Sequence, residues 1–214
     1  MKRVIGPSPH SSPDTITPLG YDPSCLPPAV CNRVPGPAPD IIFIIGFSGV
    51  GKTTQGGILA RLIGRSFIDL DQAITKRAGK TIPQIFEEEG EDRFRAMETH
   101  LLHALATTER NAVIACGGGT VCERMNRRVI KENGIGILLV ADAPTVYERT
   151  RSSDRPLLNC RNPLQKIREL MRERRPLYLE CADWIFSTSH AGPDAVGESI
   201  YKHYQARYHL SAMR

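Results

Sequence analysis

One eight-residue segment has both the residue types and the spacing to hold a triphosphate. Residues 46–53, GFSGVGKT, match the pattern G-x-x-x-x-G-K-[ST] in full. Glycines let such a loop wind tightly and aim backbone N–H groups at phosphate oxygens, and the following helix adds the positive end of its dipole. Lys52 can reach the β- and γ-phosphates, and Thr53 can ligate magnesium. The segment predicts binding of ATP and Mg²⁺, with contacts from Gly49, Val50, Gly51, Lys52, Thr53 and Thr54.

A pair of acids ends the second apolar run of the sequence. Asp69 and Asp71 flank Leu70, and strand alternation would send both carboxylates to the same side, facing a catalytic crevice. One could hold magnesium through water, while the other accepts a proton or hydrogen bond from an acceptor hydroxyl. A solvated strand end explains two acids at this spacing at least as well, so both interpretations stay open.

Two further features have a functional and a structural interpretation. Gly117, Gly118 and Gly119 follow the apolar run that ends at Cys116, which indicates either close approach of the backbone to a ligand or a tight turn. Arg95 could meet a substrate carboxylate, for which a bidentate guanidinium is well suited. Its neighbour Glu98, three residues on, allows a simple surface ion pair instead.

Two arginines precede proline-containing motifs. Arg155 begins R-P-L-L in a polar segment that reads as a loop, from which it could swing over the triphosphate and stabilise developing charge. Arg174 lies in the later segment R-R-P-L-Y. There we expect Pro176 to end the preceding helix near Arg175 and to leave an arginine at the helix carboxyl end.

Short apolar strands alternate with amphipathic helices from about residue 41 onward. The predicted strands are 41–45, 67–70, 112–116, 136–140 and 184–186. Apolar residues at helical spacing over 94–105 predict one long helix, and a C-terminal helix is expected from about Pro193. This alternation predicts an α/β fold whose parallel sheet is covered on both faces and binds ligands at the carboxyl ends of its strands.

Residues 1–39 differ in composition from the rest. They hold ten of the sixteen prolines and almost no apolar periodicity, so we expect a flexible leader followed by one folded domain over 40–214. Three explanations of this segment stay open: a targeting peptide, a regulatory tail, or a start codon assigned too early. Asp14 and Asp22 argue against an organellar transit peptide, because such peptides are poor in acids.

Composition and charge indicate a cytoplasmic protein. No apolar stretch approaches the roughly 18–20 residues of a membrane span, and the six scattered cysteines are expected to be reduced thiols. The net charge of +5 is concentrated between residues 148 and 175, where nine basic residues oppose four acids. A solvated helix explains this stretch best, and nucleic-acid binding is disfavoured because no aromatic residues interleave with the arginines.

The ordered set of motifs over roughly residues 41–190 resembles that of the shikimate kinases. It comprises the phosphate loop, D-x-D, F-R with a glutamate three residues on, G-G-G, R-P-L-L and R-x-P-L-Y. The resemblance implies a P-loop NTPase-like three-layer α/β/α sandwich with a mobile lid. It also implies transfer of the ATP γ-phosphate to the 3-hydroxyl of shikimate, on the pathway to chorismate. We expect a monomer whose only partner is this small molecule.

The same resemblance implies roles for single residues. Lys52, Asp71 and Arg155 would be catalytic, with Asp71 the candidate base and Arg155 part of the lid over ATP. Thr53 and Asp69 would lie near magnesium, and Arg149 near the nucleotide. The shikimate site would be formed by Asp71, Arg95, Gly117, Gly118, Gly119 and Arg174.

Three positions depart from the family pattern. Gly57 and Ala191 stand where arginine is usual, and Cys116 stands where threonine or serine is common. These changes leave the acceptor residues intact but could weaken nucleotide binding. Two alternatives therefore stay open, namely a related kinase with another acceptor, such as a gluconate-type or nucleotide kinase, and a catalytically silent binding module.

Overall fold

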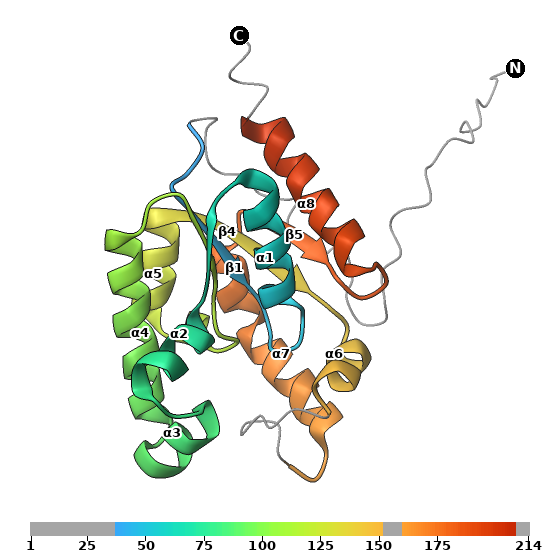
Figure 1. Cartoon of the computed structure of the whole chain (residues 1–214). Helices are drawn as coiled ribbons and strands as arrows, with labels where there is room; N and C mark the ends of the chain where they lie inside the picture. Colours follow the sequence, from blue (N-terminus) through green and yellow to red (C-terminus); the bar gives the residue numbers. More distant parts are fainter. Residues whose placement is uncertain (1–36, 152–159, 209–214) are drawn as a thin grey trace, which may run out of the picture.

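A parallel five-stranded sheet forms the centre of the molecule (Figure 1). The computed structural model describes residues 37–151 and 160–208. The strand order is β2-β3-β1-β4-β5, and every paired neighbour is parallel, as the sequence predicts. The strands are β1 (Ile41–Ile45), β2 (Ser66–Asp69), β3 (Ala112–Ala115), β4 (Gly134–Val140) and β5 (Trp184–Ser187).

Helices cover both faces of the sheet, which gives the expected α/β/α layers. They are α1 (Lys52–Ile63), α2 (Leu70–Ala78), α3 (Ile82–Glu89), α4 (Glu91–Thr108), α5 (Arg124–Asn133), α6 (Ala143–Thr150), α7 (Pro163–Cys181) and α8 (Pro193–Tyr208), with a short 3-10 helix η2 (Thr120–Cys122). Helices α1 and α8 pack against each other on one face (Figure 1). Helices α4 and α5 pack together on the other.

Successive side chains of β1 point to opposite faces of the sheet and so contribute to two separate apolar cores. Ile41, Phe43 and Ile45 pack with residues of α2, α3, α4 and α5, whereas Ile42 and Ile44 pack with residues of α1 and α8. All five side chains are buried, as expected for the central strand of a parallel sheet. Because the strands are parallel, their carboxyl ends meet at one edge, and the segments that follow them are brought together there.

The two acids do not both come from a strand. Asp69 is the last residue of β2, but Asp71 lies in the first turn of α2, so the prediction from strand alternation is wrong. The reason is capping, because Asp69 Oδ1 accepts a hydrogen bond from the Gln72 backbone N at 3.0 Å and starts the helix at Leu70.

The predicted helix end near Arg175 is also wrong. Helix α7 continues through Pro176 to Cys181, so Arg174 lies in its interior. The residues after the proline carry buried side chains, among them Tyr178 and Cys181 in the core shared with α4 and α5. Packing has overridden the local preference of proline to end a helix.

The leader predicted over residues 1–39 falls almost entirely outside the described residues, as does Arg155. Within the two described ranges, no helix is both long enough and apolar enough to cross a bilayer. The basic stretch lies mainly on α6 and α7, where most of its described side chains are exposed or half-buried; Arg174 is the buried exception.

Candidate active site

The phosphate loop joins β1 to α1 and depends on glycine conformations. Gly46, Gly49 and Gly51 have φ values of 140°, 81° and 92°, a region that side chains rarely adopt. Space is also limited, because a Cβ on Gly49 would lie 2.6 Å from Thr150 Cγ2. The loop therefore has the tight winding that a phosphate cradle needs, and α1 begins directly after it at Lys52.

The lysine and the threonine of the loop reach defined partners. Lys52 Nζ donates to the Phe47 carbonyl at 2.9 Å, so the side chain lies back over the loop. Thr53 Oγ1 donates to Asp69 Oδ2 at 2.6 Å. A hydroxyl and a carboxylate side by side next to a phosphate loop are oxygen ligands of the kind that Mg²⁺ takes, so these two residues fit the predicted metal.

The triple glycine touches three different parts of the site. A Cβ on Gly117 would lie 2.8 Å from Asp71 Oδ1, and one on Gly118 would lie 2.5 Å from Ser48 Oγ in the phosphate loop. A Cβ on Gly119 would lie 2.5 Å from both Arg95 Nη atoms. Gly118 and Gly119 form a turn that leads into η2, so the tight turn is present, and the same segment packs closely on protein atoms of the site. It thereby connects the phosphate loop to Asp71 and Arg95.

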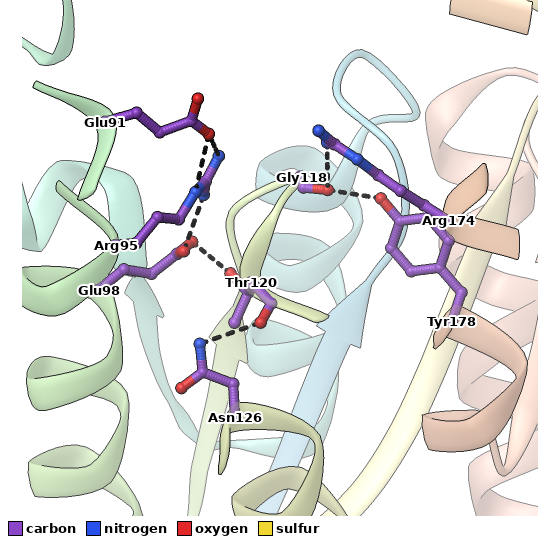
Figure 2. Close-up of polar contacts among 8 residues, drawn as sticks. All are labelled: Glu91, Arg95, Glu98, Gly118, Thr120, Asn126, Arg174 and Tyr178. Atoms are coloured by element: carbon purple, nitrogen blue, oxygen red, sulfur yellow. Dashed lines mark hydrogen bonds and ion pairs between the residues drawn. The ribbon is translucent and has the colours of Figure 1, made fainter. Parts of the chain in front are cut away.

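Arg95 is held by two carboxylates rather than in a surface ion pair (Figure 2). Its Nη1 donates to Glu98 Oε2 and its Nη2 to Glu91 Oε1, each at 2.9 Å. The Glu98 side chain is completely buried, and its Oε1 accepts a hydrogen bond from Thr120 Oγ1 at 2.5 Å. Asn126 Nδ2 supports Thr120 in turn by donating to its carbonyl at 3.0 Å.

Burial and charge act in opposite directions on this pair. Burial raises the pKa of Glu98, against the charge of Arg95 and the hydrogen bond from Thr120. Burial alone would lower the pKa of Arg95, but the negative charges of Glu98 and Glu91 outweigh it and raise that pKa. The result is a cation fixed in one position beside Gly119.

Arg174 approaches the triple glycine from α7, on the side opposite Arg95 (Figure 2). Its Nη1 donates to the Gly118 carbonyl at 3.3 Å, and Tyr178 Oη donates to the same oxygen at 2.5 Å. Arg174 is 8% exposed, and its Nε has no hydrogen-bond partner among the described residues. A buried guanidinium with a donor to spare is suited to an anionic ligand.

On the nucleotide side, Arg149 is tied to the phosphate loop through one threonine. Arg149 donates from Nη1 to Thr188 Oγ1 at 3.1 Å and from Nη2 to the Thr188 carbonyl at 2.6 Å. Thr188 Oγ1 donates to the Val50 carbonyl at 2.9 Å. The segment after β5 and the end of α6 are thus fixed next to the loop.

Comparison with known proteins identifies the group to which this arrangement belongs. A sequence model described as shikimate kinase matches residues 48–205. The shikimate kinase of Acinetobacter baumannii strain AYE is 41% identical over 160 residues, which cover 74% of this chain and 88% of that protein. The chain belongs to the shikimate kinase family.

Other members agree in sequence and in fold. The Bordetella avium shikimate kinase is 44% identical over 148 residues, covering 69% of this chain and 70% of that protein. A solved structure of shikimate kinase from Acinetobacter baumannii in complex with shikimate has a TM-score of 0.75 at 38% identity, covering 78% of this chain and 94% of that one. The shikimate kinase structure from Bacteroides thetaiotaomicron has a TM-score of 0.70 at 32% sequence identity, and the match covers 78% of this chain and 97% of that one.

The three departures from the family pattern lie in different surroundings. A Cβ on Gly57 would meet no heavy atom within 4 Å, so this position on α1 has open space beside it. Cys116 is buried, and burial raises its thiol pKa far above the ordinary value, so it is an inert side chain under the triple glycine. Ala191 is exposed in the segment before α8.

Two residues of the candidate site, Thr120 and Thr188, were missed from sequence, and Tyr178 was noted only as part of a motif, without a role of its own. Thr120, Tyr178 and Thr188 each bond to a buried carboxylate or to a backbone carbonyl of the site. Tyr178 lies four residues after Arg174, so a continuous helix would have placed both on one face. The expected end of that helix near Arg175 hid this signal, and nothing local in the sequence marks Thr120 or Thr188.

Proposed function

We propose that this protein transfers the γ-phosphate of ATP to the 3-hydroxyl of shikimate, with Asp71 and the two arginines Arg95 and Arg174 forming the acceptor site. The observation that carries the proposal is the triple glycine, which contacts Asp71, Arg95 and Arg174 and packs on Ser48 of the phosphate loop. One short segment thus connects the groups for a carboxylate-bearing alcohol to the groups for a triphosphate.

Binding of the acceptor follows from the charges. Arg95 and Arg174 reach the triple glycine from α4 and α7, and together they bind the shikimate carboxylate by charge-assisted hydrogen bonds. Relatives of this chain are named shikimate kinase, and the solved structure of the Acinetobacter baumannii shikimate kinase is a complex with shikimate. The guanidinium groups of Arg174, which is 8% exposed, and of Arg95, which is fixed by Glu98, supply the donors for this role.

In the transfer step, Asp71 accepts the proton of the 3-hydroxyl as that oxygen bonds to the γ-phosphorus. The bond between this phosphorus and the ADP oxygen breaks. Lys52 moves from the Phe47 carbonyl to the phosphate oxygens and offsets their charge, while the backbone N–H groups of the phosphate loop hold them in place. Gly49, Val50, Gly51 and Thr54 complete the nucleotide contacts.

Thr53 and Asp69 hold the magnesium ion, which supplies positive charge to the phosphates when it is bound. Arg149 orders the segment around Thr188 next to the nucleotide. The family resemblance assigns to Arg155, which lies outside the described residues, the role of excluding water from the γ-phosphate. The protein acts as a cytoplasmic monomer with a small-molecule acceptor, and it uses neither nucleic acid nor a membrane as a partner.

The deciding experiment measures ADP release from ATP and magnesium, with and without shikimate, in a coupled assay. Shikimate-dependent turnover is expected, together with its loss in Lys52→Ala and in Asp71→Asn. Arg95→Ala should chiefly damage use of shikimate. Lys202→Ala is the matched control, because Lys202 pairs only with Glu198 on the exposed surface of α8 among the described residues. ATP binding without any stimulation by shikimate would refute the proposed acceptor.

A further inference from the structure

We propose that Tyr178 is a positioning residue for the acceptor carboxylate, because its hydroxyl holds the Gly118 carbonyl and thereby fixes Arg174. The inference rests on the proposed phosphorylation of shikimate and assigns a role to a residue that touches no reacting atom.

Tyr178 and Arg174 are one helical turn apart on α7 and converge on a single oxygen (Figure 2). Tyr178 is 5% exposed and Arg174 is 8% exposed. The tyrosine hydroxyl donates to Gly118 O at 2.5 Å and Arg174 Nη1 donates to it at 3.3 Å. A carbonyl oxygen has two lone pairs, so it accepts both bonds, and the shorter one comes from the tyrosine.

The opposite side of Gly118 is fixed by the phosphate loop. A Cβ there would lie 2.5 Å from Ser48 Oγ and 2.9 Å from Ser48 N, so the glycine is packed directly on Ser48. Gly118 is therefore held between the nucleotide side and α7. The position of its carbonyl depends on the donors from α7, of which Tyr178 is the closer.

The tyrosine bond also determines what Arg174 can do. With Tyr178 satisfying Gly118 O, the guanidinium makes only a long bond there, and its Nε stays without a partner among the described residues. Donors of Arg174 are then available to the carboxylate of the acceptor. Burial raises the pKa of Tyr178 well above its ordinary value, so the hydroxyl stays protonated and remains a donor at any assay pH near neutrality.

Without the tyrosine hydroxyl, Gly118 O would keep Arg174 as its described donor. The guanidinium would then shorten its bond to this carbonyl and turn away from the acceptor carboxylate. In Tyr178→Phe we expect the KM for shikimate to rise roughly fivefold to tenfold, the change that one lost or displaced hydrogen bond produces. The KM for ATP and the kcat should stay within about twofold, because the tyrosine hydroxyl bonds to the Gly118 carbonyl and not to a group that we assign to ATP or to the reacting hydroxyl.

A second substrate separates positioning from general loosening. Methyl shikimate carries an uncharged ester in place of the carboxylate, so it gains less from Arg174. The ratio of kcat/KM for shikimate to that for methyl shikimate should fall roughly fivefold in Tyr178→Phe, since only the charged substrate loses its partner. This ratio is internal to each preparation, so a lower folded fraction does not change it.

Tyr201→Phe is the matched control. Its hydroxyl accepts a hydrogen bond from Gln205 Nε2 at 2.7 Å on α8, away from the site, so both the KM and the ratio should equal those of the wild type. Arg174→Lys and the double variant Tyr178→Phe/Arg174→Lys complete a double-mutant cycle. The losses of kcat/KM for shikimate in the two single variants should be far from additive in the double variant.

The inference is overturned if Tyr178→Phe leaves the KM for shikimate unchanged, or if use of both substrates falls in parallel. Wild-type protein without shikimate-dependent turnover would instead refute the proposed function itself, so the two failures are distinguishable.

Discussion

Gly119→Ala tests how closely the triple glycine positions Arg95. The added Cβ would lie 2.5 Å from Arg95 Nη1 and Nη2 and 2.6 Å from Cζ. Ordinary contact between such atoms needs about 3.5 Å, so the guanidinium must withdraw by about 1 Å. The backbone itself accepts alanine, because φ of Gly119 is −108°. The closest contacts of the new methyl group are therefore all with the Arg95 guanidinium.

That displacement has two consequences of different size. The Arg95–Glu98 bond of 2.9 Å is stretched or broken, and Glu98 is completely buried, so its charge loses part of its compensation. Since Glu91 still pairs with Arg95, we expect the free energy of unfolding to fall by only about 1–3 kcal/mol. A 1 Å misplacement of a substrate-positioning group costs on the order of 100-fold, which is our expectation for kcat/KM with shikimate.

The assay is steady-state kinetics with each substrate varied in turn, next to thermal unfolding of the same preparations. Gly57→Ala is the control, because its Cβ meets nothing within 4 Å, and alanine in a helix is expected to add roughly 0.5–1 kcal/mol of stability. In Gly119→Ala the KM for ATP should stay within about twofold. A Gly119→Ala enzyme with wild-type kcat/KM for shikimate would show that Arg95 does not hold the acceptor.

Three further changes have defined outcomes. Glu98→Gln removes the buried partner of Arg95 and should lower the free energy of unfolding by about 2–4 kcal/mol in denaturant titrations, with weaker use of shikimate; an unchanged midpoint would contradict this. Thr53→Ala should raise the magnesium concentration for half-maximal activity about tenfold, measured by titration at fixed ATP, and an unshifted curve would remove Thr53 as a ligand. Burial alone would raise the pKa of Asp142, but hydrogen bonds from Thr145 outweigh it and hold this pKa below the ordinary 3.8. The carboxylate therefore stabilises the fold fully above pH 3.8, and this stabilisation is lost as the pH falls through the pKa of the folded state. Asp142→Asn keeps an N-cap and should flatten the stability profile in that acidic range, measured by unfolding from pH 5 to about pH 2.5.

The phosphate loop and the sheet could be predicted because their signals are local. Three glycines, Lys52 and Thr53 lie within eight residues, and each strand carries its own apolar run between helical stretches. Strand limits differ from the expected ones by at most two residues, the largest difference being the earlier start of β4 at Gly134. Such edges depend on pairing with a neighbour, here Ile41 of β1, which the sequence of one strand does not reveal.

The supports of the site could not be predicted for the opposite reason. Tyr178 is separated by 60 residues from the carbonyl it binds, and Thr188 by 138 residues from Val50. A sequence does not display which backbone carbonyls the strands and helices leave without partners, so a side chain that binds one of them looks like any other polar residue. The ion pair between Arg95 and Glu98 was expected at the surface, but the Glu98 side chain is completely buried. This difference has the same origin, because Glu98 is bound by Thr120 of η2, which is distant in the sequence.

Pro176 shows how one local rule can hide a functional arrangement. Proline inside a helix costs about 3 kcal/mol, which is why the helix was expected to end at Arg175. The turn beyond it buries Tyr178 and Cys181, and each such side chain contributes about 1.5–3 kcal/mol, so continuing the helix is the more stable choice. Continuity is also what places Tyr178 on the same face as Arg174, where both reach the Gly118 carbonyl. A helix ending at Arg175 would leave Arg174 as the one donor from α7 to that carbonyl, among the bonds that the described residues make, and would turn the guanidinium away from the acceptor. The geometry of the acceptor site therefore depends on the helical turn after Pro176, which the proline rule predicts to be absent.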